Sequence, residues 1–228
     1  MATNTLITYR DLLGVNVREC NEELVSLTDY NLMCSYKSRM CDMQLYLGNK
    51  VLVRRSVANM LQKAQKNLVS IHSKYLLNVT YGFRSIEIQT KLFKGMVSHV
   101  AQDIYYENPV ELYEKVHEYI AVPVVSGHPT GGAVDITIFD SVCGADIDMG
   151  SKMYVFDDRC RTFDQSIGEI GQSNRKLLRS LMLDVGFAPY DGEYWHFSYG
   201  DREWAKYYAK NNAMYEQISL SQATKLLR

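Results

Sequence analysis

Residues 126–139 have the sequence SGHPTGGAVDITIF, a glycine-rich turn that runs directly into a strand. In the strand, valine and isoleucine occupy every second position, which is the period of a strand with one fully apolar face. Gly131 and Gly132 can adopt backbone angles that other residues rarely adopt, so the turn can fold back on the strand. We therefore expect the side chains of His128 and Asp135, seven positions apart, to converge.

A second histidine ends the sequence EYWH at residues 193–196, which we interpret as part of an aromatic strand over residues 194–198. Two histidines and one carboxylate are a common ligand set for catalytic zinc, with a fourth position open for water. On this interpretation His128, Asp135 and His196 bind the metal, and Glu193 is the general base that accepts the proton of the water. The spacing alone also fits a core histidine and an aspartate that only shapes a turn.

A lone arginine, Arg84, follows the apolar segment 75–81, where a long cation is unexpected. It could stabilise the oxyanion that forms when water attacks a peptide carbonyl, although a surface salt bridge is the simpler explanation. The other histidines, His72, His99 and His117, have no acidic or histidine partner at a ligand spacing, and we expect structural roles for them. The motifs H-E-x-x-H, the P-loop and G-x-G-x-x-G are absent from the sequence.

Hydrophobic periodicity predicts helices and strands in an irregular order. The predicted helices span residues 54–69, 86–98, 111–120, 174–185 and 202–211, and the predicted strands span residues 75–81, 133–139 and 194–198. Ser173 is a predicted N-cap of the helix that follows it. Because helices and strands do not alternate regularly, an α+β fold is favoured over a doubly wound sheet. No linker or repeat is visible, so we expect a single domain over residues 1–228.

The composition limits the partners and the location of the protein. Lys and Arg number 25 against 26 Asp and Glu, and this near-neutral balance argues against a nucleic-acid partner. No apolar stretch is long enough for a membrane span, and no export signal is visible at the N-terminus. The five cysteines, an odd number without a C-x-x-C pair, indicate mostly buried thiols in a reducing compartment. We expect a cytoplasmic protein, or a periplasmic one if a signal peptide has been removed.

The two motifs together resemble a known family. The pattern S-x-H-x-x-G-x-A-x-D at residues 126–135, followed by E-x-x-H at residues 193–196, resembles the zinc D-alanyl-D-alanine dipeptidases, especially the vancomycin-resistance type. Residues 174–187 are similar to the C-terminal helix of that family, and residues 149–157 are similar to its Met-Gly…Phe-Asp segment. The resemblance covers about residues 25–200.

The resemblance implies a fold, an activity and further site residues. The fold would be a central antiparallel sheet flanked by helices, with a zinc cleft along it, similar to the signalling domain of Hedgehog proteins. One zinc ion per chain would support hydrolysis of the small dipeptide D-alanyl-D-alanine to two D-alanines. Arg84 matches the arginine that polarises the scissile carbonyl, and Ser126 and Asp157 match positions that bind the amino group of the substrate. Ser85 replaces the proline that usually follows the arginine, so we expect a less rigid turn there.

Two alternatives stay open from the sequence. The same metal site could serve a D,D-carboxypeptidase or endopeptidase that acts on peptidoglycan stem peptides. The chain could also be a zinc-stabilised binding module without catalysis. The presence of Glu193 and Arg84 favours an enzyme, and the lack of a cell-wall-binding repeat favours the dipeptidase. No pattern in the sequence predicts an oligomeric state.

Overall fold

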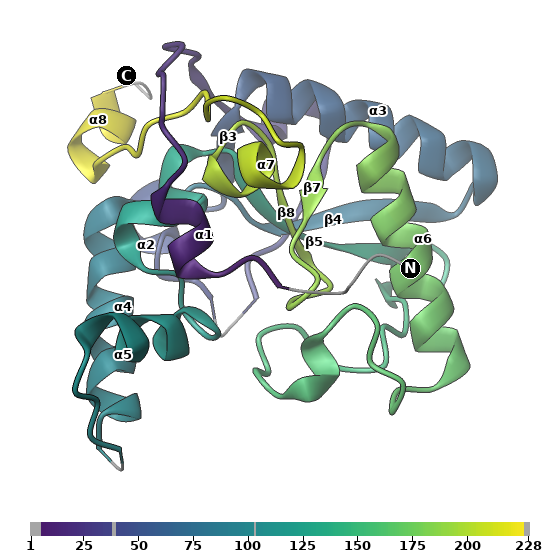
Figure 1. The fold of residues 1–228 in the computed structure, drawn as a ribbon. Helices are drawn as coiled ribbons and strands as arrows, with labels where there is room; N and C mark the ends of the chain where they lie inside the picture. Colours follow the sequence, from purple (N-terminus) through teal and green to yellow (C-terminus); the bar gives the residue numbers. More distant parts are fainter. Residues whose placement is uncertain (1–5, 38–39, 103, 226–228) are drawn as a thin grey trace.

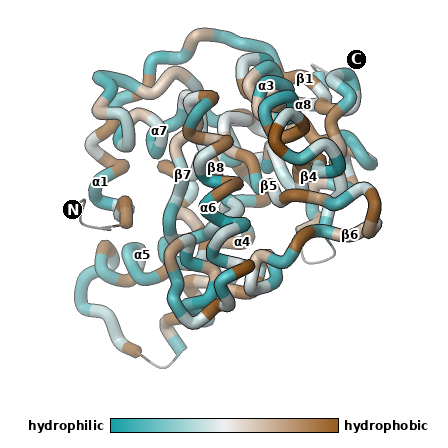
Figure 2. Tube along the Cα trace, turned by 90° about the vertical axis from the view of Figure 1, so that its right-hand side faces the viewer, coloured by the Kyte–Doolittle hydropathy of each residue, from teal (hydrophilic) through white to brown (hydrophobic). Residues whose placement is uncertain are grey.

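A six-stranded sheet organises the chain, whose computed structural model describes residues 6–37, 40–102 and 104–225 (Figure 1). Its strands are β2 Met33–Cys34, β4 Tyr75–Tyr81, β5 Ala133–Asp140, β6 Ala145–Asp146, β7 Ala188–Pro189 and β8 His196–Ser198. The order is β2-β4-β5-β8-β7, and β6 pairs with the far end of β5. Figure 2 shows β7, β8, β5 and β4 in that row. The predicted antiparallel sheet is confirmed, except that β2 runs parallel to β4.

Eight helices surround the sheet in the described part of the chain. They are α1 Tyr9–Leu13, α2 Gln44–Leu47, α3 Arg55–Ile71, α4 Ile86–Val100, α5 Pro109–His117, α6 Glu169–Asp184, α7 Arg202–Tyr207 and α8 Leu220–Lys225. Short 3-10 turns occur at η1 Leu27–Tyr30, η2 Pro123–Val125, η3 His128–Thr130 and η4 Asp158–Cys160. A separate antiparallel ribbon joins β1 Leu24–Ser26 to β3 Leu52–Arg54.

The predicted helices are present, but several of their ends differ. Helix α6 begins at Glu169 after Gly168, so the prediction of Ser173 as its N-cap is wrong; the acidic Glu169 suits the positive end of the helix dipole. Helix α5 begins at Pro109, whose missing N–H costs nothing in the first turn, after an Asn108 cap. It ends at His117, three residues before the predicted end. Helix α7 also ends early, at Tyr207.

The apolar face of β5 supports the main core, as its alternation predicts. Val134, Ile136 and Ile138 are fully buried in one cluster with side chains of α3 and α6, such as Leu61 and Leu178. Figure 1 shows α3 and α6 lying together beside the sheet, away from α4 and α5. The alternate residues of β5 therefore face away from this core, where polar side chains can serve a site.

A second, smaller apolar cluster lies under helices α1, α4 and α5. It includes Leu12 of α1, Phe93 of α4 and Val116 of α5. Glu114 of α5 fixes α1 in place, because its two carboxylate oxygens accept the backbone N–H groups of Tyr9 and Arg10, each at 2.9 Å. These N–H groups have no partner within the helix, so Glu114 satisfies two donors at once.

Two expectations from composition can be compared with the structure. The cysteines are not mostly buried: Cys160 is buried, whereas Cys20, Cys41 and Cys143 are exposed. Within the described ranges, no helix has both the length and the apolar character needed to cross a bilayer.

Arg175 of helix α6 is fully buried and binds the segment that precedes this helix. Arg175 donates from Nε to the Met149 carbonyl at 2.7 Å, from Nη1 to the Arg161 carbonyl at 2.6 Å and from Nη2 to Ser151 Oγ at 2.9 Å. Its guanidinium also lies 4.1 Å from the centroid of the Tyr194 ring. The Arg175 side chain thus joins residues 149–151, Arg161 and Tyr194, which lie outside the helices and strands.

We expect Arg175→Met to lower the free energy of unfolding by about 3 kcal/mol, because three acceptors lose a charged donor. Lys176→Met is the matched control, since Lys176 is an exposed neighbour on the same helix and should change stability by less than about 0.5 kcal/mol. Urea denaturation of both variants measures the difference. Equal stability of the two variants would contradict a structural role for Arg175.

Candidate metal centre and active site

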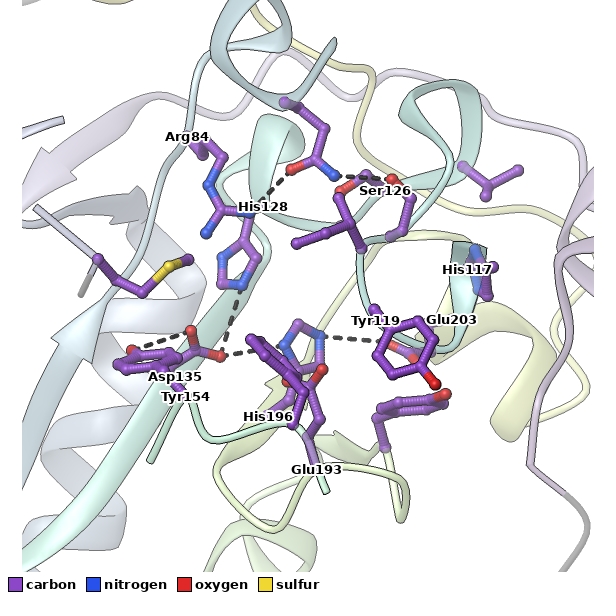
Figure 3. Close-up of a pocket in the computed structure, with 18 of the residues that line it drawn as sticks. Arg84, His117, Tyr119, Ser126, His128, Asp135, Tyr154, Glu193, His196 and Glu203 are labelled. Atoms are coloured by element: carbon purple, nitrogen blue, oxygen red, sulfur yellow. Dashed lines mark hydrogen bonds and ion pairs between the residues drawn. The ribbon is translucent and has the colours of Figure 1, made fainter. Parts of the chain in front are cut away.

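Two histidines and an aspartate meet at one end of the central strands. Asp135 Oδ1 lies 3.5 Å from His128 Nε2 and 3.1 Å from His196 Nδ1. One donor atom from each of the three side chains lies within 4.8 Å of the others, and Figure 3 shows the three pointing toward one another. Ligands about 2.0–2.2 Å from one ion lie roughly 3–3.5 Å apart, so this donor set fits a single zinc ion.

Strand pairing and a tight turn bring these three residues together. Asp135 of β5 and His196 of β8 are direct partners across the antiparallel pair. His128 enters from the turn η3, which Gly131 ends with φ of +73°. This positive φ is a backbone angle that residues with a side chain rarely adopt, so glycine suits the end of the turn. The predicted convergence of His128 and Asp135 is therefore present in the fold.

The ring nitrogen of His128 that faces away from the cluster is also engaged. Its Nδ1 lies 2.8 Å from the carbonyl oxygen of Gly82, an acceptor, so Nδ1 carries the proton. This leaves the lone pair of Nε2 free for a metal ion, which is the arrangement common to metal-binding histidines. Burial lowers the pKa of His128, which also favours the neutral ring.

The other two ligands are held by side chains that the sequence analysis missed. The Tyr154 hydroxyl donates to Asp135 Oδ2 at 3.1 Å, which leaves Oδ1 to face the two histidines. Glu203 Oε2 lies 3.2 Å from His196 Nε2. Tyr154 has φ of +60°, an uncommon backbone angle for an aromatic residue and one that often marks a functional site. The acidic Glu203, shortly after the metal-binding strand, was a signal that could have been used.

Glu193 and His196 come together through a turn. The prediction that residues 194–198 form a strand is wrong at its start, because β8 begins at His196. Residues three apart in a strand face opposite sides, whereas here the N–H of His196 donates to the carbonyl of Glu193 at 3.0 Å and closes a turn. Both side chains consequently line one cavity. Burial raises the pKa of the Glu193 carboxyl to about 7, a value suited to a base near neutral pH.

Arg84 and Ser126 line the same cavity and are almost fully buried. The turn after Arg84 is well anchored even though Ser85 replaces proline. The N–H of Ser85 contacts Met43 Sδ at 3.5 Å, and its Oγ accepts from the N–H of Ile88 at 3.4 Å as the N-cap of α4. These two contacts hold the turn in the absence of the proline.

Asp157 lies apart from these residues. Its carboxylate binds the guanidinium of Arg159, with Nη2 to Oδ2 at 2.6 Å, and its side chain is 38% exposed. It lines an adjoining groove and is absent from the lining of the cavity around the histidines. The structure thus does not bring Asp157 together with the other predicted site residues, because its 3-10 turn η4 directs it outward.

The cavity is small and opens beside a larger groove. It has a volume of about 80 Å³, and Leu12 of α1 forms part of its wall. The groove has a volume of about 710 Å³. Both are lined by His117, Tyr119, Phe156 and Tyr190. His117, for which we expected only a structural role, therefore lies at the boundary between the two.

A sheet that presents two histidines and an aspartate beside a half-buried glutamate has the site of a metallopeptidase. The sequence profile of the D-ala-D-ala dipeptidase family matches residues 27–216, and the chain belongs to this family of peptidases.

Individual relatives agree with the family. The D-alanyl-D-alanine dipeptidase of Synechocystis sp. is 26% identical, over 91% of this chain and 94% of its own length. The enzyme of the same name from Enterococcus faecalis is 27% identical, over 72% of this chain and 80% of its own length. Among solved structures, the LdcB LD-carboxypeptidase is 19% identical with a TM-score of 0.47, covering 94% of this chain and 85% of its own. That last likeness is too distant to bear on function.

We expect the affinity of the cluster for divalent ions to rise with pH. Burial lowers the pKa of His196, but the hydrogen bonds and charges of Asp135 and Glu203 outweigh it and raise this pKa well above the ordinary value. Without metal the ring is protonated at pH 7, so an ion has to displace a proton from Nδ1. Calorimetry with zinc in buffers of different ionisation enthalpy should show release of about one proton. Binding without proton release would contradict this protonation state.

Proposed function

We propose that this chain hydrolyses D-alanyl-D-alanine to two D-alanines, using one zinc ion held by His128, Asp135 and His196. The observation that carries the proposal is the cavity itself, which is lined by the three-residue cluster together with Glu193 and Arg84. The D-alanyl-D-alanine dipeptidases from two organisms that match most of this chain add support. The substrate is a small zwitterion, which needs no large charged surface for capture.

In the proposed reaction Glu193 moves the proton. A bound zinc ion would supply Lewis acidity and make water acidic enough to lose a proton near neutral pH. Glu193 accepts this proton as the water attacks the peptide carbonyl, and then donates it to the leaving amine. Its raised pKa suits both steps, because the carboxyl group can hold the proton between them.

Arg84 and Ser126 bind the substrate in this proposal. The guanidinium of Arg84 donates to the carbonyl oxygen, and this contact strengthens as negative charge develops on that oxygen. Arg84 is 4% exposed, so the surrounding protein does little to screen its charge. The Ser126 hydroxyl is suited to the amino group of the dipeptide. Asp157 lines the adjoining groove and not this cavity, so the proposal gives it no part in that task.

The adjoining groove favours one alternative, a D,D-carboxypeptidase or endopeptidase. Four residues line both spaces, so a peptide extended beyond two residues could lie partly in the groove. The small volume around the cluster and the wall formed by Leu12 favour the dipeptide. A binding module without catalysis is disfavoured, because it would have no use for a carboxylate base and a buried arginine beside the cluster.

The assignment of Glu193 predicts a separation of catalysis from metal binding. Glu193→Gln keeps the size of the side chain but cannot accept the proton, so kcat should fall about 10²–10⁴-fold while zinc content stays near one per chain. His196→Ala should instead lose most of the zinc, because one of three ligands is gone. Release of D-alanine and metal analysis of the purified proteins measure both effects. Unchanged zinc content in a His128→Ala, His196→Ala double variant would rule out this site.

The length of the substrate separates the two enzyme functions. We expect rapid release of D-alanine from free D-alanyl-D-alanine, and its loss on treatment with a chelator. An N-acylated tripeptide that ends in D-Ala-D-Ala should be cleaved at least about tenfold more slowly, because the wall formed by Leu12 leaves little space for its extra residue. Cleavage of the blocked peptide alone would favour the carboxypeptidase.

A further inference from the structure

The guanidinium of Arg84 is held from two sides. Its Nε donates to the hydroxyl oxygen of Tyr81 at 3.1 Å, and its Nη1 donates to Gln89 Oε1 at 2.9 Å. The guanidinium carbon also lies 4.5 Å from the centroid of the Tyr81 ring. Within the described ranges no hydrogen bond of Nη2 is found, so this nitrogen is left for a group in the cavity that Arg84 lines.

The hydroxyl group of Tyr81 has its own acceptor. It donates to Asp42 Oδ1, so its oxygen lone pairs are free to accept from Arg84. Tyr81 is fully buried, and burial raises the pKa of its phenol, which therefore stays neutral. A neutral group thus stands between the carboxylate of Asp42 and the guanidinium of Arg84.

A β-bulge aims Tyr81 at this position. Along β4, Val79 pairs with Ile136 of β5, whose side chain belongs to the main core. The register then shifts, and Tyr81 pairs with Asp135, whose side chain faces the metal cluster. Val79 and Tyr81 are two residues apart and would share one face of a regular strand. The bulge re-aims Tyr81, as bulges beside active sites often do. The Tyr81 ring consequently packs edge-on against the His128 ring, with 5.3 Å between the ring centroids.

Because the Tyr81 phenol is neutral, it leaves the positive charge of Arg84 largely uncompensated. A carboxylate bound directly to Arg84 would cancel much of its charge and compete with the developing oxyanion for the same donors. The phenol fixes the orientation of the guanidinium and keeps Asp42 one side chain further away. The positive charge at Nη2 therefore remains available to the substrate.

We propose that Tyr81, backed by Asp42, is a positioning residue that orients Arg84 and reserves its Nη2 for the carbonyl oxygen of the substrate. The proposal rests on the proposed function, because it acts through the role assigned to Arg84. A displacement of a catalytic group by about 1 Å can cost roughly 10²-fold in rate. The hydroxyl of Tyr81 should therefore matter for kcat more than for KM.

Tyr81→Phe removes the hydroxyl and keeps the ring under the guanidinium. We expect kcat for D-alanyl-D-alanine to fall about 10–100-fold, with KM within about twofold and zinc content unchanged. Tyr215→Phe is the matched control. Tyr215 is also buried, also lies under an arginine, with Arg54 at 4.7 Å from the ring centroid, and also donates to a carboxylate, Glu22 Oε2 at 3.0 Å. Its arginine differs from Arg84 in that Arg54 does not line the cavity. Its variant should keep the wild-type kcat.

The Arg84→Ala background decides whether Tyr81 acts through Arg84. Adding Tyr81→Phe to Arg84→Ala should lower kcat no further, because the side chain to be oriented is gone. An equal loss in both backgrounds, or no loss from Tyr81→Phe in the wild type, would overturn the proposal.

A measurement without substrate separates the proposal from the function on which it rests. The Nε–H of Arg84, assigned by the loss of its NMR signal in Arg84→Lys, should exchange slowly with solvent in the wild type and fast in Tyr81→Phe. Unchanged exchange would overturn the positioning role even in an active enzyme. A wild type that orders Arg84 in this way but cleaves no D-alanyl-D-alanine would instead defeat the proposed function.

Discussion

The carboxylate of Asp135 is the charge around which the site is built. It is 2% exposed, in the middle of a sheet, and burial alone would raise its pKa. The histidines outweigh burial and keep the pKa of Asp135 below its ordinary value. A buried charge is tolerated only when it is paired and hydrogen-bonded on all sides. The two histidines therefore stabilise the buried charge of Asp135, in addition to being candidates for metal binding with it.

The need to pair this buried charge explains why the cluster has such complete outer contacts. In each of the three side chains, the atom that faces away from the cluster has its own partner. The partners are the Gly82 carbonyl for His128, the Tyr154 hydroxyl for Asp135 and the Glu203 carboxylate for His196. Each contact fixes the orientation of one ligand before an ion arrives, which reduces the conformational entropy lost on binding. The sheet supplies the rigidity, because Asp135 and His196 are cross-strand partners and move only with the strands.

The sequence predicted the parts of this site that depend on local patterns. The alternation in residues 126–139 identified the core face of β5, and the glycines identified the turn that carries His128. The resemblance to a family joined these residues to Glu193 and His196. Local patterns could not predict that a turn separates Glu193 from β8, since an aromatic run has the composition of a strand.

The partners that lie far apart in the chain were harder to foresee. Tyr81 reaches its place through a bulge, and Tyr154 through an unusual backbone angle; neither leaves a periodic signal in the sequence. Asp157 matched a family motif, but it caps the turn η4, and its carboxylate binds Arg159 and lines the groove. Motif matching identifies residue types, whereas side-chain direction depends on backbone geometry that composition does not encode.

Helix α1, which forms one wall of the cavity, is held in place by different contacts from those that hold the residues of the cluster. Asp135 and His196 stand on paired strands, whereas α1 is a helix of five residues, too short to be stable alone, and Glu114 of α5 holds its first turn. Changes in this attachment alter the space beside the cluster without moving a ligand. Under the proposed function, substrate length and bond cleavage therefore depend on different parts of the chain, so that selection could change the first through α1 without altering the paired strands.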